Sequence, residues 1–447
     1  MTKKTIFHST WVSCFWLLSI AKSIGQEVKT FANLDAVLSF AKTQNSSFEQ
    51  AALQSQLAKL TKQTAIGNVL NPRVPASVQV LDHIKQQVSF LPGQAFGMPE
   101  GTFKAITMGQ QYASTLSVQP QFDILNLSSW AQIKSASINQ DLVDNQNQMN
   151  EQKLYDQINM TYFNLISMQG QQQILKENIQ LAQNVALIMQ NKFKEGLARK
   201  QDLNEALSNL LGLQDKMQQL EWNMKIQHQI LDLYFENRVQ SEVIETVWEF
   251  EKTAPLQVAN NPLWIDNAEL QKQMAQQDKR VLMLQNVPVL SFVSSFNWQN
   301  LSNDGFFAAS SNGVSYHYVG LKLSYDFPTT VQKIANLKSK SVQLEQLENQ
   351  AQHVQKEQDH KNKQMQLEFE KAKGQVVFLK QIFELKKDSY EKNFNQFKEN
   401  ILPLDKLLLS QTDMLNSQLQ WVAGLSNVGY CWWRIRINNQ FLAKETK

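Results

Sequence analysis

The chain has 447 residues, enough for one to three domains, and carries 43 lysines and arginines against 40 aspartates and glutamates. Residues 1–25 are typical of a secretory signal peptide, with small residues at Ser23 and Gly25; a lipoprotein anchored at Cys14 is the alternative. The mature chain is then neutral, which argues against a nucleic-acid binder. Its one cysteine, Cys431, can form neither an intramolecular disulfide nor a zinc site.

No stretch of the mature chain has the ~18 consecutive apolar residues that a membrane-spanning helix needs. A secreted, neutral chain without such a helix is either soluble outside the cytoplasm or crosses a membrane as a β-barrel.

Helical and strand-like periods alternate along the first half of the mature chain. An apolar stripe with helical spacing covers about Phe31 to Gly67. Alternation with period 2 follows over about 74–84 and 112–122, and each segment has the length of a tilted membrane-spanning strand. The proline-free stretch 127–195 then predicts a helix of roughly 100 Å, because an α-helix rises about 1.5 Å per residue.

The long helix is predicted to end at Gly196, because glycine adopts the left-handed conformation that follows many helices without a Cβ clash. Apolar residues at heptad spacing over 201–238 predict a return helix, so the two form a hairpin with its tip at Gly196. Repeat 1 therefore covers 26–240. Residues 241–260 are expected to form a connector that packs partway along the helices.

The same order of elements then starts again in repeat 2, 261–447, which makes the chain a duplication. Its second long helix is predicted to end at Asn400, because asparagine also tolerates the left-handed conformation, and Pro403 suits the first turn of a helix. The expected elements of repeat 2 are a helix over 261–286, strands over about 289–298 and 316–327, a long helix over 329–399, a return helix over 403–430 and a C-terminal tail.

Four strands are too few to close a barrel, which usually needs about 8. Open sheet edges in a bilayer leave backbone groups without hydrogen bonds, each costing several kcal/mol. The strands therefore imply an oligomer in which several chains close one barrel. The alternative is a periplasmic or surface coiled-coil structural protein without channel activity, whose strands form a soluble sheet.

Short motifs mark the same junctions in both repeats. They are Asn71-Pro72-Arg73 and Asn261-Pro262 near the short helices, Phe122-Asp123 and Asp326-Phe327-Pro328 after the strand pairs, and Phe193 to Gly196 with Asp202, Leu203 and Ala206 at the first tip. Together with the duplication, they resemble the TolC family of outer-membrane efflux channels over nearly all of the mature chain. The resemblance implies a mainly α fold with a small β part, in which two tandem repeats each combine a β-hairpin with long antiparallel coiled-coil helices.

The same resemblance implies a homotrimer, with an α-barrel tunnel in the periplasm capped by a 12-stranded transmembrane β-barrel in the lipid of the outer membrane. Such a channel belongs to a tripartite efflux or type I secretion system and is a passive conduit from periplasm to exterior. The implied partners are a periplasmic adaptor, also called a membrane fusion protein, and an inner-membrane pump.

The resemblance also assigns candidate residues to the periplasmic entrance. The acidic rings that the family often carries beyond its second tip fall here on Lys406 and Leu409. We therefore hypothesise that Asp202 and Glu205 supply the acidic ring, helped by Asp405; solvated, capped turns are the alternative. The tip residues singled out are Gly196, Arg199, Asp202, Glu205, Asn400, Pro403 and Asp405.

Aromatic residues in the second strand pair fit a belt at the membrane boundary, namely Trp298, Tyr316 and Tyr318, although buried strand aromatics are the alternative. The Asn- and Gln-rich segment 139–152 lies in a proline-free helical stretch, so we expect it to form a polar, pore-facing stripe. His353 and His360 lie seven residues apart, a spacing that does not favour a metal site. No catalytic or nucleotide-binding motif is present, so we expect neither an enzyme nor a cofactor or metal.

Overall fold

The computed structural model describes residues 27–70, 73–327 and 330–441, and its contacts divide the chain into two compact units. The predicted signal peptide, Cys14, Asn71-Pro72 and Pro328 lie outside the described residues. We call the two units the helical unit and the strand unit. Within the described residues, the helical unit comprises 27–45, 160–251 and 379–426, and the strand unit comprises 46–70, 73–159, 252–327, 330–378 and 427–441.

Three helices contribute to both units. α3 (Leu127–Lys194) and α6 (Val331–Lys398) have 68 residues each, as expected for proline-free stretches with a sustained apolar period. α7 (Leu404–Gln440) continues past residue 430, so the predicted end of the return helix is wrong. The reason is that its apolar seam continues through Cys431, Trp433, Ile435 and Ile437, which are all buried.

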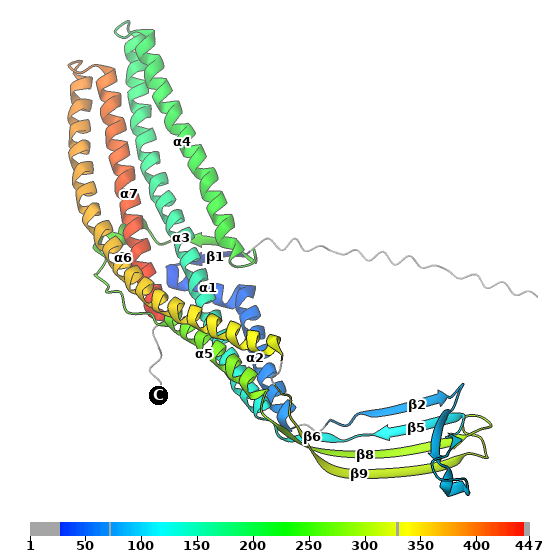
Figure 1. The fold of residues 1–447 in the computed structure, drawn as a ribbon. Coiled ribbons are helices and arrows are strands. Elements are labelled where there is room, and N and C mark those ends of the chain that lie inside the picture. Colours follow the sequence, from blue (N-terminus) through cyan, green and yellow to red (C-terminus); the bar gives the residue numbers. More distant parts are fainter. Residues whose placement is uncertain (1–26, 71–72, 328–329, 442–447) are drawn as a thin grey trace, which may run out of the picture. The chain divides into compact units, whose positions relative to one another are not determined.

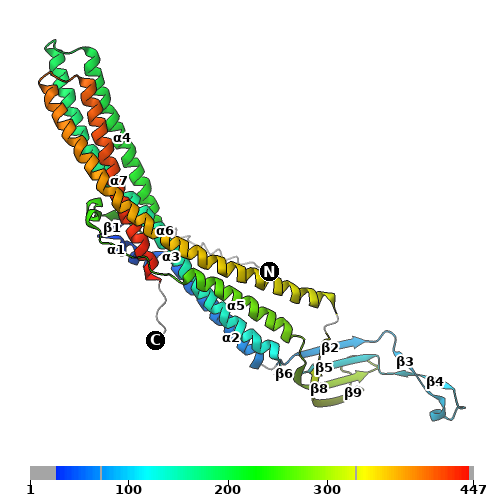
Figure 2. The same cartoon turned by 60° about the vertical axis from the view of Figure 1, so that its left-hand side comes forward.

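In the helical unit, α3, α6 and α7 run beside α4 (Lys200–Leu233) (Figures 1 and 2). One apolar cluster fills the space between them near the hairpin tips. Its members include Val185, Met189, Ala206, Phe397 and Leu407, and each is at least nine-tenths buried. The heptad pattern therefore serves helix-against-helix packing, as predicted.

Gly170, the one glycine of α3, allows two other segments to approach this helix closely. A Cβ at Gly170 would lie 2.8 Å from a methyl carbon of Val422 in α7 and 3.0 Å from one of Val247. Val247 begins the 3-10 helix η2 (Val247–Lys252). Any larger residue would force these contacts apart, which explains a glycine inside an otherwise strongly helical segment.

The first predicted helix differs from the sequence-based expectation. The helix predicted over 31–67 is instead α1 (Leu34–Gln44) and α2 (Ser46–Leu70), which separate at Asn45. The extended backbone of Asn45 lets its side-chain amide donate to the carbonyl of Tyr234 at 3.0 Å.

The predicted connector contributes β7 (Val239–Val243), which pairs in parallel with β1 (Glu27–Phe31). Five-residue strands far apart in the sequence give little periodic signal, so this pairing was not predicted.

Polar side chains take part in the helix packing of the strand unit. α5 (Leu263–Leu284) lies along α2 and the first half of α3 (Figures 1 and 2). Asn145 donates to the carbonyl of Leu263 at 3.0 Å and accepts from Asn267 at 2.8 Å, and Gln152 accepts from the buried Asn261 at 3.2 Å. Asn145 and Gln152 of the Asn- and Gln-rich segment are therefore used for hydrogen bonds inside the unit. For the rest of the segment, the polar, pore-facing stripe stays a prediction.

The main sheet is antiparallel. Across it, β2 comes first, β5 and β6 together take the second place, β8 is third and β9 is last. β5 and β6 both pair with β8 and are successive parts of one strand, interrupted at Gln119 and Pro120, because proline cannot donate to the ladder. β2 and β9 are the edges and run in opposite directions. The bounds are Ala76–Asp82 for β2, Tyr112–Val118 for β5, Gln121–Leu125 for β6, Val289–Ser302 for β8 and Asn312–Ser324 for β9.

A second hairpin lies at the end of the sheet remote from α2 and α5 (Figure 2). It consists of β3 (Gln87–Pro92) and β4 (Phe103–Met108), joined through the 3-10 helix η1 (Gly93–Phe96). These two short strands were not predicted, because the glycines and prolines between residues 84 and 112 interrupt any alternation with period 2.

Candidate channel surfaces

The register of the sheet separates its side chains into two chemically different faces, because directly paired residues share a face. Leu116 pairs with Trp298, and Phe292 with Leu321, whereas Ser117 pairs with Asn297. We call the first side the apolar face, with Val78, Leu116, Val118, Phe122, Leu290, Phe292, Phe296, Trp298, Val319, Leu321 and Leu323. The other side is the polar face, with Ser77, Gln79, Ser117, Ser291, Ser295, Asn297, Tyr316, Tyr318 and Lys322.

On the central strand β8, burial is inverted between the two faces. Phe296 and Trp298 on the apolar face are 36% and 44% exposed, whereas Ser295 and Asn297 on the polar face are 1% and 5% exposed. The buried polar groups bond to one another: Ser117 donates to Asn297 at 2.7 Å, and Asn297 donates to Ser295 at 2.8 Å. A water-soluble sheet buries its apolar side instead, so this sheet fits apolar surroundings on its outside and polar ones on its inside.

The three aromatic residues predicted as one membrane belt do not share a face. Trp298 lies on the apolar face, where it pairs with Ser315. Tyr316 pairs with Asn297 and Tyr318 with Ser295, so both tyrosines lie on the polar face. The strand register, which the sequence alone does not give, separates them.

Both edge strands keep one side free of partners within the described residues. β2 pairs only with β5, and β9 pairs only with β8 along its whole length. Each free side presents a row of backbone N–H and C=O groups. The two edges run antiparallel, so an edge β9 of one sheet suits an edge β2 of another.

The first helical tip has the geometry predicted for it. Gly196 has φ 73°, and the N–H of Leu197 donates back to the carbonyl of Lys192 at 2.8 Å, as in a glycine C-cap. Arg199 precedes α4, and its guanidinium binds both carboxylate oxygens of Asp202 at 2.9 and 3.2 Å. Hydrogen bonds from Arg199 hold the pKa of Asp202 below its usual value. Asp202 therefore caps α4 as one half of an ion pair.

The second tip uses Asn400, which has φ 62°. The Lys192 ammonium of α3 donates to the Asn400 side-chain oxygen at 2.6 Å and lies 4.6 Å from the centre of the Phe397 ring. This link between the two tips was missed, because nothing in the sequence relates residues so far apart. Pro403 directly precedes α7 and accepts from the N–H of Leu407 at 3.3 Å.

The structure places Glu205 in the first turns of α4 and Asp405 in the first turn of α7. Both side chains are exposed. Because Asp202 is bound to Arg199, Glu205 and Asp405 are the two candidates at the tips whose charge faces solvent. Lys406 and Leu409 are also exposed.

Among the described residues, no helix combines the length and the apolar character needed to cross a membrane. In the same residues, no group of three or more His, Cys, Asp or Glu side chains is placed to hold a metal ion. Cys431 is buried as a free thiol, and burial raises its pKa to about 11.

Comparison with known proteins gives the fold its context. No family model matches the sequence, and no curated protein sequence matches it. Solved structures do match. The Campylobacter jejuni CmeC outer membrane channel is 12% identical and superposes with a TM-score of 0.74 over 93% of this chain and 87% of that chain. The outer membrane protein VceC from Vibrio cholerae is 13% identical, with a TM-score of 0.71 over 90% of this chain and 94% of that chain.

A third solved structure is the open state of the Neisseria gonorrhoeae MtrE outer membrane channel. It is 11% identical, with a TM-score of 0.65, and the match covers 93% of this chain and 91% of that chain. These identities are low, so the likeness establishes the fold. The mainly helical chain with a small antiparallel sheet, expected from the resemblance to the TolC family, is therefore confirmed.

Proposed function

We propose that this protein is an outer-membrane channel, a passive conduit that exports substrates from the periplasm to the exterior within a tripartite efflux or type I secretion system. The observation that carries the proposal is the inverted burial on the central strand β8, where apolar side chains such as Trp298 are partly exposed and polar ones such as Asn297 are buried. That arrangement suits a strand surrounded by lipid outside and by a water-filled lumen inside. The shared fold with solved outer membrane channels supports it.

The proposed assembly is a homotrimer. Backbone groups on the free sides of β2 and β9 cost several kcal/mol each if they meet hydrocarbon without partners. Pairing β9 of one copy with β2 of the next satisfies them in the antiparallel sense. Three copies of the four-stranded sheet then close a 12-stranded barrel in the outer membrane.

The helices are proposed to close the periplasmic tunnel in the same way. Within the helical unit, α4 exposes large apolar side chains at Leu211, Trp222 and Ile226, and α6 exposes Leu385. A lone solvated helix gains nothing from these residues, whereas a neighbouring copy would cover them. We propose that these faces of α4 and α6 contact adjacent copies.

Transport energy comes from the partners in this scheme, because the sequence has no nucleotide-binding motif. A periplasmic adaptor would dock near Gly196 and Asn400 and connect the channel to an inner-membrane pump. Docking would untwist the hairpins at the tips and widen the entrance, a change within the repertoire of packed helices.

The test is fractionation followed by conductance. The expressed chain should remain in the outer-membrane fraction after a salt and carbonate wash, and migrate as a trimer on gels until the sample is heated. In planar bilayers the purified trimer should give discrete conductance steps. A protein that washes off the membrane as a soluble monomer would instead be the coiled-coil structural protein, and the channel proposal would be abandoned.

Charge at the entrance gives a second test. Glu205→Ala is expected to reduce the preference of the conducting channel for cations, because its carboxylate faces solvent at the tip. Asp202→Ala should change selectivity less, because Arg199 already neutralises that carboxylate, and should mainly weaken the start of α4. Reversal potentials in a salt gradient measure both effects. Unchanged selectivity in Glu205→Ala would exclude repeat 1 as the source of an acidic ring.

A further inference from the structure

The apolar face of the sheet contains a groove at its end remote from the helices. The row Ser114, Asn300 and Gly313 runs straight across three strands, since Ser114 pairs with Asn300 and Asn300 with Gly313. Gly313 has no side chain and that of Ser114 is small, whereas the adjacent row carries the bulky side chains of Leu116 and Trp298. The step between the two rows produces a cavity of about 460 Å³.

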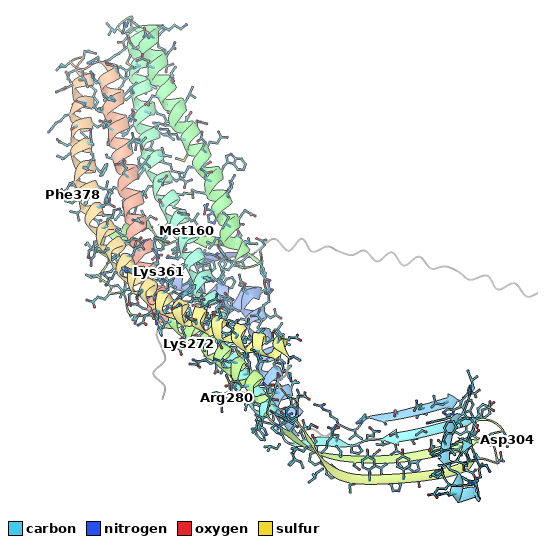
Figure 3. All side chains as sticks on the ribbon, in the orientation of Figure 1. Met160, Lys272, Arg280, Asp304, Lys361 and Phe378 are labelled. Atoms are coloured by element: carbon cyan, nitrogen blue, oxygen red, sulfur yellow. The ribbon has the colours of Figure 1, made fainter. Side chains whose placement is uncertain are left out.

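The loop between β8 and β9 forms the other side of this groove. Asp304, labelled in Figure 3, marks the loop at the far end of the sheet. Phe306 packs edge-on against Tyr112 of β5, with ring centres 4.8 Å apart. Phe307 follows with φ 60°, an unusual conformation for a bulky residue, and lines the cavity opposite Leu116 and Trp298. The ring contact of Phe306 with Tyr112 is what connects this loop to the apolar face.

The residues that line the cavity suit an apolar chain rather than an ion. Val78, Leu116, Trp298 and Phe307 supply hydrocarbon, and no charged side chain lines the cavity. Ser114 and Asn300 add neutral groups at the floor, able to bond an ester or amide. A volume of about 460 Å³ lies in the range of ~300–1,000 Å³ that is usual for ligand sites.

The position of the groove identifies the source of such a chain. It opens onto the apolar face, next to side chains such as Val78 that are 71% exposed. Phe307, itself 72% exposed, stands at the same edge. We propose that this groove binds an acyl chain of a membrane lipid, held between Trp298 and Phe307 at the outer end of the sheet. This proposal rests on the proposed function, since only a sheet embedded in lipid meets acyl chains there.

Gly313 provides a direct way to fill the groove. A Cβ built on Gly313 meets no atom within 4 Å, and its φ is not in the left-handed region, so a side chain fits without strain. Gly313→Phe should occupy the floor beside Asn300. Gly320→Phe is the matched control, because Gly320 lies on the same strand with open space around it but pairs with Val293 on the polar face.

The experiment uses the full chain in vesicles of phosphatidylethanolamine and phosphatidylglycerol. A phosphatidylethanolamine with a diazirine in its acyl chain is activated by light, and labelled residues are identified by mass spectrometry. We expect label at Trp298 and Phe307 above the level at Leu321 and Leu323, which lie on open apolar face. Gly313→Phe should abolish this excess while leaving Leu321 and Leu323 labelled, and Gly320→Phe should match the unaltered chain.

The outcomes separate the two proposals. If Leu321 and Leu323 take no label, the sheet is not in lipid and the channel proposal fails together with this one. If they are labelled but Trp298 and Phe307 show no excess, or Gly313→Phe retains it, the groove does not hold an acyl chain although the channel proposal stands. Should Gly313→Phe not assemble as a trimer, Gly313→Val is the smaller substitution for the same comparison.

Discussion

Gly196 and Asn400 both hold left-handed backbone at the helical tips, but they do so with different side chains. At Gly196 the absence of a Cβ removes the steric conflict, and the space around it is open. At Asn400 the side chain instead accepts a hydrogen bond from Lys192. The sequence predicted both turns, since glycine and asparagine are the residues that this conformation selects. It could not predict the Lys192 contact, which depends on the packing of α3 against the second tip.

Replacing Gly196 by alanine tests the cost of the left-handed conformation. Gly196→Ala should lower the free energy of unfolding by about 1–2 kcal/mol, because an L side chain meets the next carbonyl oxygen in this conformation. Gly212→Ala, at an exposed glycine within α4 that also has open space, should stabilise by roughly 0.5–1 kcal/mol. Thermal unfolding followed by circular dichroism measures both. Equal effects of the two substitutions would contradict the role of φ.

Asp156 on α3 makes stability depend on pH. Burial raises the pKa of its carboxyl from 3.8 to about 6, and the Arg434 guanidinium, which lowers the pKa, offsets part of this. The folded chain therefore binds more protons than the unfolded chain between these values. The stabilising contribution of protonated Asp156 is complete below about pH 4 and is lost as pH rises through about 6.

Asp156→Asn should remove that dependence. At pH 7.5 the variant should be more stable than the unaltered chain, by up to about 3 kcal/mol at 1.36 kcal/mol per pH unit, and at pH 4 the difference should vanish. Asp141→Asn, at an exposed position of the same helix, is the control and should change little at either pH. Unfolding temperatures at the two pH values decide the matter; a variant less stable at pH 7.5 would show that charged Asp156 is stabilising.

Among the elements, long helices could be predicted well and short pieces poorly. α3 and α6 have seams repeated over many turns, so their bounds are nearly those expected from 127–195 and 329–399. The break at Asn45 depends on a hydrogen bond to Tyr234, a residue distant in sequence. The end of α7 was placed too early, because a run of tryptophans and arginines after residue 430 obscured buried positions such as Ile435.

Asn261 shows how polar side chains hold helices of the strand unit together. It is fully buried, accepts from the N–H of Leu263 at 3.0 Å and donates to Gln152 at 3.2 Å. Asn261→Leu should destabilise by roughly 1–3 kcal/mol for each buried group left without a partner. Asn349→Leu, at an exposed position of α6, should be close to neutral. Chemical denaturation of both variants provides the comparison, and similar midpoints would mean that the network adds nothing.

At the scale of the whole molecule, the sequence predicted four strands with alternating character but not which residues share a face. The strand register decides which residues share a face, and it places Tyr316 and Tyr318 on the opposite face from Trp298. Alternation did identify the apolar residues within β8 and within β9 separately. The groove lined by Phe307 could not be recognised from the sequence, because it depends on where the loop between β8 and β9 lies relative to the sheet.

A charge on the apolar face should act through the membrane alone. Leu321→Arg should leave the isolated fold intact, since Leu321 is 68% exposed, yet oppose insertion by about 2–4 kcal/mol if the residue lies near the bilayer midplane. Tyr318→Arg, on the polar face of the same strand, should assemble normally, as the native Lys322 already does there. Trimer yield in the outer-membrane fraction measures the effect. Equal yields would contradict a lipid-facing apolar side.

The free strand edges have a consequence for the life of a newly made chain. In a single chain, the free edges of β2 and β9 expose backbone groups without hydrogen-bond partners, and the apolar face of the sheet is exposed to water. This combination favours amyloid-like aggregation. If copies pair as proposed, association covers these edges, so the yield of assembled protein is expected to depend on concentration, in competition with aggregation.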